Sequence, residues 1–233
     1  MTSTRSWLSV VTLLCSSSLL GESRAAPPTT IPALDAIAVR VAPTDRAVPK
    51  PLFVAVHGQC ELAEDACARW SKGVGDRGFL VCPRGNVQCP PGGATWGGPH
   101  RADRVYLGIE ATRLAHPGEV DARATTLIGF SLGAPVALEA ASSGMTGCKG
   151  LVLIASLTIE PDVSKLRAAG VDRVVLAASD FDMSWSHMHA IEKRLAKEGM
   201  ATRFVGLGKV GHLLPPDLGA RMADALSWVS ESR

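Results

Sequence analysis

The sequence predicts an α/β fold, doubly wound around a mostly parallel sheet, in a single domain. Short apolar runs alternate along the chain with longer stretches whose apolar residues recur at helical spacing. This alternation is typical of strand–helix–strand units. Most of the later apolar runs show no in–out alternation, as expected for parallel strands that helices cover on both faces. The length of 233 residues suits one domain of this class.

Seven runs are candidate strands. The run at 36–41 alternates apolar and polar residues, which favours an antiparallel strand at an edge of the sheet. The other six candidates lie at 51–58, 79–83, 125–130, 150–156, 173–179 and 202–208.

Helices are expected in the gaps between these strands. The helix over 132–143 ends before Gly144, a residue type that favours the position after a helix C-terminus. Pro135 falls in its first turn, where a missing N–H costs little. The segment 157–172 is too short for a large cap domain. The other expected helices are 61–77, 102–114, 186–198 and 216–228.

The first 25 residues differ from the rest of the chain. Arg5 precedes an apolar stretch over 7–20, and Ser23 and Ala25 supply small residues at positions −3 and −1 of a cleavage site. This order predicts a signal peptide (1–25) before a domain at 26–233, and a secreted or periplasmic protein. The apolar stretch is too short and interrupted for a stable membrane span. The alternative is a disordered tail on a cytosolic protein.

Five cysteines remain after such a cleavage, so at least one stays unpaired. Sequence neighbours suggest the pairs Cys60–Cys67 and Cys82–Cys89, with Cys148 as a small buried apolar residue. No CxxC motif is present and no histidine stands at ligand spacing around the cysteines, so we expect no metal.

The stretch TLIGFSLGAP contains Gly129, Ser131 and Gly133 in a GxSxG pattern. It directly follows an expected strand and precedes an expected helix, which is the context of a nucleophile elbow. A tight turn there leaves little room for side chains two positions either side of the serine, and the helix N-terminus stabilises developing negative charge. Ser131 is therefore the candidate nucleophile; the alternative is an ordinary serine in a Gly-rich turn.

A serine nucleophile needs a base, and in this kind of fold the acid and then the histidine follow the serine in the chain. His212 lies after the strand expected at 202–208 and directly behind Gly211. Asp180 and Asp182 both follow the strand expected at 173–179. Asp182 is favoured because it lies farther out on the loop, where it could orient the imidazole and stabilise its charged form.

An oxyanion formed at Ser131 needs two backbone N–H donors. One is expected from Leu132, the residue after the nucleophile. The other is expected from the turn after the strand 51–58, with Gln59 favoured and Cys60 as the alternative. His57 in this turn suits a structural hydrogen-bonding role better than that of a base.

These residues, in this order, resemble the α/β-hydrolase superfamily over essentially all of the chain after the leader. The resemblance rests on HGQC (57–60), GFSLG (129–133), Asp182 within ASDFD, and GH (211–212). The chain is similar to small lidless carboxylesterases, dienelactone hydrolases and polyester-depolymerase-like members. This resemblance implies a Ser131–His212–Asp182 triad that hydrolyses esters or thioesters without a metal or other cofactor.

The segment 83–100 is rich in Gly and Pro and has little helix or strand character. Such long loops are usually functional or disordered, and after a parallel strand this one lies at the sheet edge where α/β folds bind ligands. Trp96 here and Trp185 beside the acid loop are the candidate substrate contacts. The alternative, slightly favoured for Trp96, is that its ring packs the loop onto the core.

The sequence thus predicts an exported, monomeric serine hydrolase that acts on a small-molecule or acyl ester. Net charge is only +2 with no long basic cluster, which argues against an electrostatic nucleic-acid binder. Two alternatives remain open. One is a catalytically silent binding protein of the same fold, and the other is a thioesterase or peptidase with the same triad.

Overall fold

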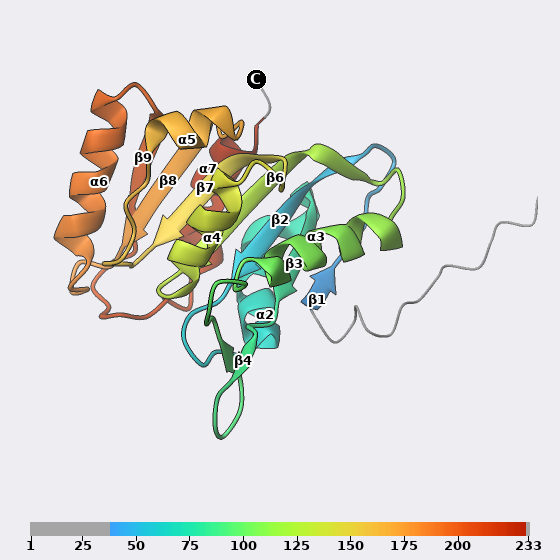
Figure 1. Cartoon of the computed structure of the whole chain (residues 1–233), viewed down its shortest axis with the longest axis horizontal. Helices are drawn as coiled ribbons and strands as arrows, with labels where there is room; N and C mark the ends of the chain where they lie inside the picture. Colours follow the sequence, from blue (N-terminus) through green and yellow to red (C-terminus); the bar gives the residue numbers. More distant parts are fainter. Residues whose placement is uncertain (1–37, 232–233) are drawn as a thin grey trace, which may run out of the picture.

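A seven-stranded sheet lies between two layers of helices in the computed structural model, which describes residues 38–231 (Figure 1). The strand order is β1-β3-β2-β6-β7-β8-β9. The strands are β1 (Ala38–Val41), β2 (Lys50–Val56), β3 (Phe79–Pro83), β6 (Val120–Phe130), β7 (Cys148–Ile154), β8 (Arg173–Ala178) and β9 (Ala201–Gly206). The expected leader at 1–25 lies outside the described residues.

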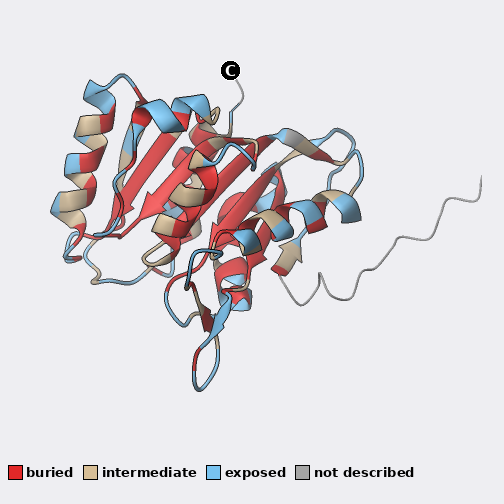
Figure 2. Ribbon diagram, viewed as in Figure 1, coloured by how far each residue is buried: buried red, intermediate tan, exposed pale blue. Residues whose placement is uncertain are grey.

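Helices cover both faces of the sheet, which confirms the predicted doubly wound α/β class. Buried residues of α3 (Asp103–Ala115), α4 (Gly133–Ser142), α5 (Val163–Ala168) and α6 (Trp185–Lys197) belong to one hydrophobic core. Those of α2 (Ala63–Val74) and α7 (Leu218–Ser230) belong to the core on the other face. Figure 2 shows the central strands almost continuously buried, which explains their unbroken apolar sequences.

Strand directions follow the prediction. β1 pairs antiparallel with β3 at one edge, and every other pairing of the large sheet is parallel. β6 begins at Val120, earlier than expected, because its first half carries Asp121 and Arg123 and so lacks an apolar run. The carboxyl ends of the six parallel strands therefore meet at one edge, where an α/β sheet binds ligands.

Two small elements were not expected. Helix α5 has six residues and starts at an N-cap, Asp162, whose carboxylate accepts a hydrogen bond from the Lys165 N–H. The Gly- and Pro-rich segment after β3 forms a short hairpin of β4 (Val87–Gln88) and β5 (Ala94–Thr95). Both are too short to produce a periodic pattern. No helix among residues 38–231 is long and apolar enough to cross a membrane.

The predicted disulfide pairs are wrong. The bonds join Cys60 to Cys89 and Cys67 to Cys82. Cys67 lies inside α2 on its buried face, against β3, so it meets Cys82 rather than its sequence neighbour. Cys148 is unpaired and buried, as expected, and its burial raises the thiol pKa to about 12.

Candidate active site

Ser131 lies in a sharp turn between β6 and α4. Its φ of +52° is in the left-handed region, which is strained for a residue with a side chain. The Ser131 N–H donates to the Ile154 carbonyl at 2.9 Å, and the Ser131 carbonyl accepts from the Ala134 N–H at 3.0 Å. These bonds fix the strained turn between the end of β7 and the first turn of α4.

The two glycines that flank Ser131 are required because backbone atoms of neighbouring segments approach them too closely for a side chain. A Cβ atom on Gly129 would lie 2.6 Å from the Cα of Ala134, and one on Gly133 would lie 2.2 Å from the Val56 carbonyl oxygen. Both contacts are with backbone atoms, which cannot move aside cheaply. The glycines of the GxSxG pattern are therefore needed because β6, α4 and the end of β2 pack tightly around Ser131.

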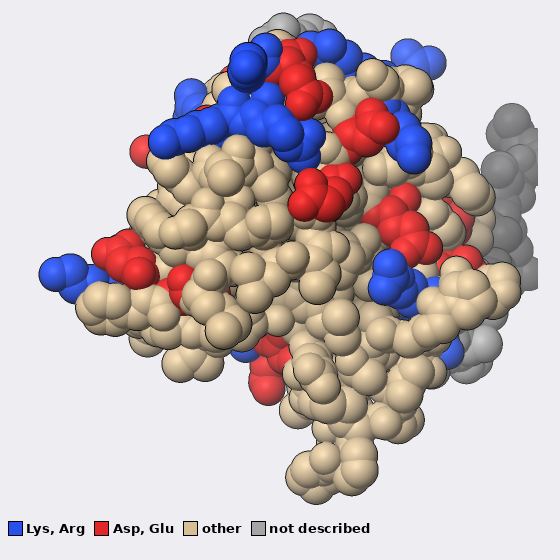
Figure 3. Space-filling model, turned by 60° about the vertical axis from the view of Figure 1, so that its left-hand side comes forward, with Lys and Arg blue, Asp and Glu red and all other residues tan. Residues whose placement is uncertain are grey.

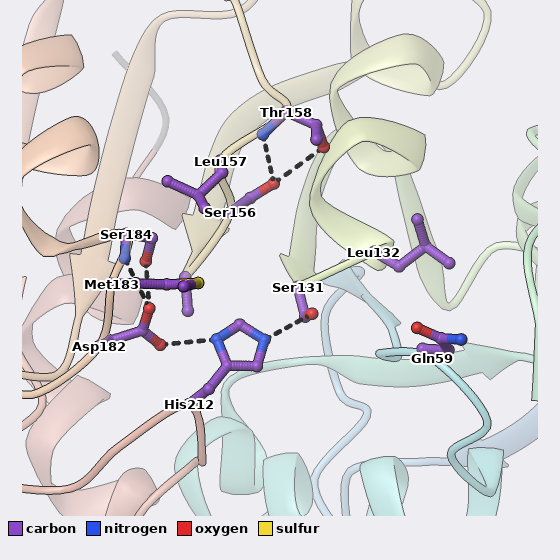
Figure 4. Close-up of a pocket in the computed structure, with 11 residues that line it drawn as sticks. Gln59, Ser131, Leu132, Ser156, Leu157, Thr158, Asp182, Met183, Ser184 and His212 are labelled. Carbon is purple, nitrogen blue, oxygen red and sulfur yellow. Dashed lines mark hydrogen bonds and ion pairs between the residues drawn. The ribbon is translucent and has the colours of Figure 1, made fainter.

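Three side chains from three loops form one hydrogen-bonded chain (Figure 4). His212, between β9 and α7, places its Nε2 2.7 Å from the Oγ of Ser131. Its Nδ1 lies 2.7 Å from Oδ2 of Asp182, which follows β8. The Phe130 ring stacks beside the imidazole, with ring centroids 5.5 Å apart.

Asp182 is buried, and its second carboxylate oxygen also accepts hydrogen bonds. Oδ1 accepts hydrogen bonds from both the N–H and the hydroxyl of Ser184, each at 2.8 Å. Burial raises the pKa of the Asp182 carboxyl, but the bonds from Ser184 and His212 outweigh it, so the net pKa is below its ordinary value. Asp182 is thus held as a carboxylate that faces the imidazole.

The structure brings Asp182, and not Asp180, to His212. Asp180 is exposed, and its N–H donates to the Gly208 carbonyl at 3.0 Å. Ser184 was missed by the sequence reasoning. The signal was present, because a serine two residues after an aspartate can close a local turn onto that carboxylate.

A cavity of about 260 Å³ opens at Ser131. In Figure 4, Gln59 and Leu132 lie on one side of Ser131, and Leu157 and Met183 lie on the opposite side. The other residues that line the cavity are Ala155, Ser156, Thr158, Asp182, Ser184 and His212. The two candidate donors of an oxyanion hole, Gln59 and Leu132, therefore border the same space as the serine; Cys60 does not line it.

Neither tryptophan lines this cavity. Trp96 is only 4% exposed and belongs to the hydrophobic core, where its Nε1–H donates to the His57 carbonyl at 2.9 Å. Trp185 is the first residue of α6, and its ring packs edge-on against Phe204. The predicted substrate contacts of Trp96 and Trp185 have no support in this geometry, and the favoured alternative for Trp96, a ring that packs its loop onto the core, is confirmed.

Four exposed apolar residues, which the sequence did not lead us to expect, lie on the loops that carry the site, and we call them the apolar rim. It consists of Leu157, Phe181, Met183 and Leu213, which are 50%, 69%, 78% and 68% exposed. Leu157, after β7, and Met183, after β8, line the cavity, whereas Phe181 and Leu213 directly adjoin Asp182 and His212 in the chain. Between residues 38 and 231, no group of three His, Cys, Asp or Glu side chains is placed to hold a metal ion.

Comparisons with known proteins support the fold. The sequence matches no family model, and a search of curated proteins found no match. Solved structures do match. Esterase PE8 is 20% identical with a TM-score of 0.59, over 83% of this chain and 98% of that one. The Bacillus cereus carboxylesterase is 17% identical with a TM-score of 0.58, over 82% and 92% of the two chains.

A third match is FphF, a fluorophosphonate-binding serine hydrolase of Staphylococcus aureus. It is 11% identical, with a TM-score of 0.62, over 84% of this chain and 92% of that one. The protein therefore has the α/β-hydrolase fold, with a mostly parallel sheet and no cap domain evident among the described residues. The solved structures that share this fold include esterases, serine hydrolases and a thioesterase.

Proposed function

We propose that this protein is a serine hydrolase that cleaves carboxylic esters. The observation that carries the proposal is the chain of two 2.7 Å contacts, from Ser131 Oγ to His212 and from His212 to Asp182. A serine hydroxyl is a weak nucleophile until a base is within hydrogen-bond reach, and this geometry supplies one. The matches to esterases and serine hydrolases add support.

In the proposed mechanism, Ser131 Oγ attacks the ester carbonyl carbon while His212 Nε2 accepts the hydroxyl proton. Asp182 accepts a hydrogen bond from Nδ1–H, which selects the tautomer with a free Nε2 and stabilises the imidazolium. The N–H groups of Leu132 and Gln59 donate to the oxyanion. His212 returns the proton to the leaving alcohol, and a water molecule, activated by the same histidine, then releases the acid from Ser131.

The substrate that the cavity suits best is uncharged and apolar near the scissile bond. Asp182 is the only charged residue among those that line the cavity, and both of its oxygens already have partners. A charged acyl group would therefore lose water without gaining a partner. Leu157 and Met183 offer apolar contact at the mouth, so a short or medium-length acyl chain can lie over the rim.

The surface around the site is consistent with this preference. In Figure 3, Lys and Arg side chains gather along the upper part of the face. Most of the lower part, towards which the carboxyl ends of the strands point in Figure 1, is uncharged. The scarcity of charged side chains there fits a substrate that is uncharged near the scissile bond.

A panel of esters tests the proposal directly. Purified protein should hydrolyse nitrophenyl esters of uncharged acids, and an ester with a terminal carboxylate on the acyl chain should be a poor substrate. The Ser131→Ala variant should be inactive on all of them. A thioester and a peptide of matched acyl group belong in the same panel. Faster turnover of either would reassign the bond that is cleaved.

We also propose that the protein works outside the cytoplasm. The leader-like residues 1–25 and the two disulfides support this location, since disulfides persist in oxidising compartments. Expression of the full chain followed by fractionation and N-terminal sequencing of the mature protein tests it. A start at or near Ala26 in the exported fraction is expected, and an intact Met1 in the cytoplasm would contradict the proposal.

A further inference from the structure

The turn that carries Gln59 is fastened to a distant segment of the chain. We call residues 57–60 the oxyanion loop and residues 84–97, which contain the β4–β5 hairpin, the strap. Glu61, which directly follows the loop, pairs with Ala94 of the strap in an isolated β-bridge, and the Ala94 N–H donates to the Glu61 carbonyl at 3.1 Å. The strap thus lies along the end of the oxyanion loop.

Two buried hydrogen bonds join the strap to His57. The indole N–H of Trp96 donates to the His57 carbonyl at 2.9 Å, and the Gly85 N–H donates to the His57 Nε2 at 3.1 Å. Since Nε2 accepts, the ring proton is on Nδ1, which donates to the Gly58 carbonyl at 2.8 Å. Burial lowers the pKa of His57, which keeps this ring neutral. One imidazole therefore connects the strap to the backbone just before Gln59.

A disulfide joins the two segments on the other side of Gln59. Cys60 is bonded to Cys89 of the strap. Cys60 has a φ of +54°, a conformation that persists only when its surroundings hold it. The strap also packs on its backbone, because a Cβ on Gly93 would lie 2.5 Å from the Cys60 carbonyl oxygen. The residues before and after Gln59 are thus both held from the strap.

We propose that the strap positions the Gln59 N–H as an oxyanion donor, with His57, Cys60, Cys89 and Trp96 as positioning residues. This inference rests on the proposed esterase function. Oxyanion donors act only when they are held close to their productive geometry. A loop fixed on both sides of the donor residue meets this requirement, and a free Gly-containing turn does not.

The proposal makes activity dependent on the oxidation state of one disulfide. Cys60 is exposed, whereas Cys67 and Cys82 of the second bond are 2% and 0% exposed. A small dithiol therefore reaches the Cys60–Cys89 bond first. Two electrons and two protons pass to the two cysteine sulfurs as the dithiol closes into its own disulfide. The reduced protein should keep its fold and turn over substrate more slowly.

The test compares two disulfide variants of the full chain, Cys60→Ala/Cys89→Ala and Cys67→Ala/Cys82→Ala. On a short nitrophenyl ester, the first should lose about 10- to 100-fold in kcat with little change in KM, as expected when an oxyanion donor is loosened. Its affinity for a boronic acid that mimics the tetrahedral intermediate should fall in parallel. The second variant, which leaves the strap attached, should keep most of its kcat while folded.

Melting temperature and circular dichroism separate positioning from stability. If Cys60→Ala/Cys89→Ala is folded and turns over like the wild type, the proposal is overturned. An equal loss of kcat in both disulfide variants would also overturn it, because the loss would then follow from stability alone.

Trp96→Phe provides an independent check, since it removes the indole N–H and keeps an aromatic ring in the core. It should lower kcat about 10-fold with KM retained. If Cys60→Ala/Cys89→Ala does not fold, the proposal is tested by Trp96→Phe and by reduction of the folded wild type. Full activity in both would show that the strap does not position Gln59. Failure of the esterase proposal itself would look different, because the wild type would then hydrolyse no ester.

Discussion

Asp182 Oδ2 lies 2.7 Å from His212 Nδ1, and the other oxygen of the same carboxylate accepts two hydrogen bonds from Ser184. The acid of the site is therefore fixed in orientation before any substrate is bound. Its ring partner can adopt only one productive tautomer, with Nδ1 protonated and Nε2 free to accept a proton from Ser131. This relationship leads to the first two predictions.

Replacing Asp182 with Asn should abolish most of the activity without unfolding the protein. The amide keeps the size of the carboxylate but can donate to Nδ1, which favours the wrong tautomer; in well-studied triads such a change costs about 10⁴ in kcat. Steady-state kinetics on a short ester measures the effect. Asp180→Asn is the matched control, since Asp180 is exposed and does not contact His212, and its kcat should stay within about threefold of wild type.

The stability of the protein should depend on pH through Asp182. The folded-state pKa of this carboxyl is below its unfolded value of about 3.9. Its contribution to the free energy of unfolding is therefore fully present above that value and is lost as pH falls through the lower folded pKa. Melting temperatures of wild type and Asp182→Asn between pH 7 and pH 2 test this. The difference between the two proteins should shrink on acidification, and a constant difference would contradict the assignment.

Gly133 should not tolerate a methyl group. In Gly133→Ala the new Cβ would approach the Val56 carbonyl oxygen to 2.2 Å, so β2 and α4 must separate at the point where Ser131 is held. We expect a loss of about 1–3 kcal/mol in the free energy of unfolding or more, together with a large loss of kcat. Denaturant unfolding and ester kinetics measure both. Gly92→Ala is the control, because a Cβ there meets no atom within 4 Å, and equal behaviour of the two variants would refute the packing argument.

The fold and much of the site were predictable because short sequence patterns and the order of elements along the chain determine them. Unbroken apolar runs indicated buried parallel strands, and GxSxG between a strand and a helix indicated the elbow at Ser131. The distance along the loop favoured Asp182 over Asp180, and the structure brings Asp182 to His212. These features depend on a few neighbouring residues and on the order of elements in the chain.

Features that depend on contacts between distant segments were not predictable. The disulfides join Cys60 to Cys89 and Cys67 to Cys82 because α2 lies against β3 and the strap folds back on the oxyanion loop. For Trp96 the sequence left two interpretations open, and the slightly favoured one, in which the ring packs the loop onto the core, is the one found in the structure. Nothing in the sequence next to the four cysteines specifies which of them pair.

The apolar rim should favour esters with longer acyl chains over those with short ones. Met183→Glu places a charge at the mouth of the cavity, where a long acyl chain would lose apolar contact. We expect kcat/KM to fall about 10-fold or more for octanoyl esters, about 1.4 kcal/mol, and to change little for acetyl esters. Met145→Glu serves as the control, since Met145 is 70% exposed on the turn before β7 and does not line the cavity. A chain-length profile that is the same in Met183→Glu and wild type would rule out the rim as a binding surface.

The most direct test of the central claim is to react the purified protein with a fluorophosphonate and locate the adduct by mass spectrometry. The account predicts one adduct, on Ser131, that forms at the same rate at which ester hydrolysis is lost. In Ser131→Ala both the adduct and the hydrolysis should be absent, while the melting temperature stays close to that of the wild type. An unlabelled Ser131, or ester hydrolysis that survives in a folded Ser131→Ala protein, would contradict the account.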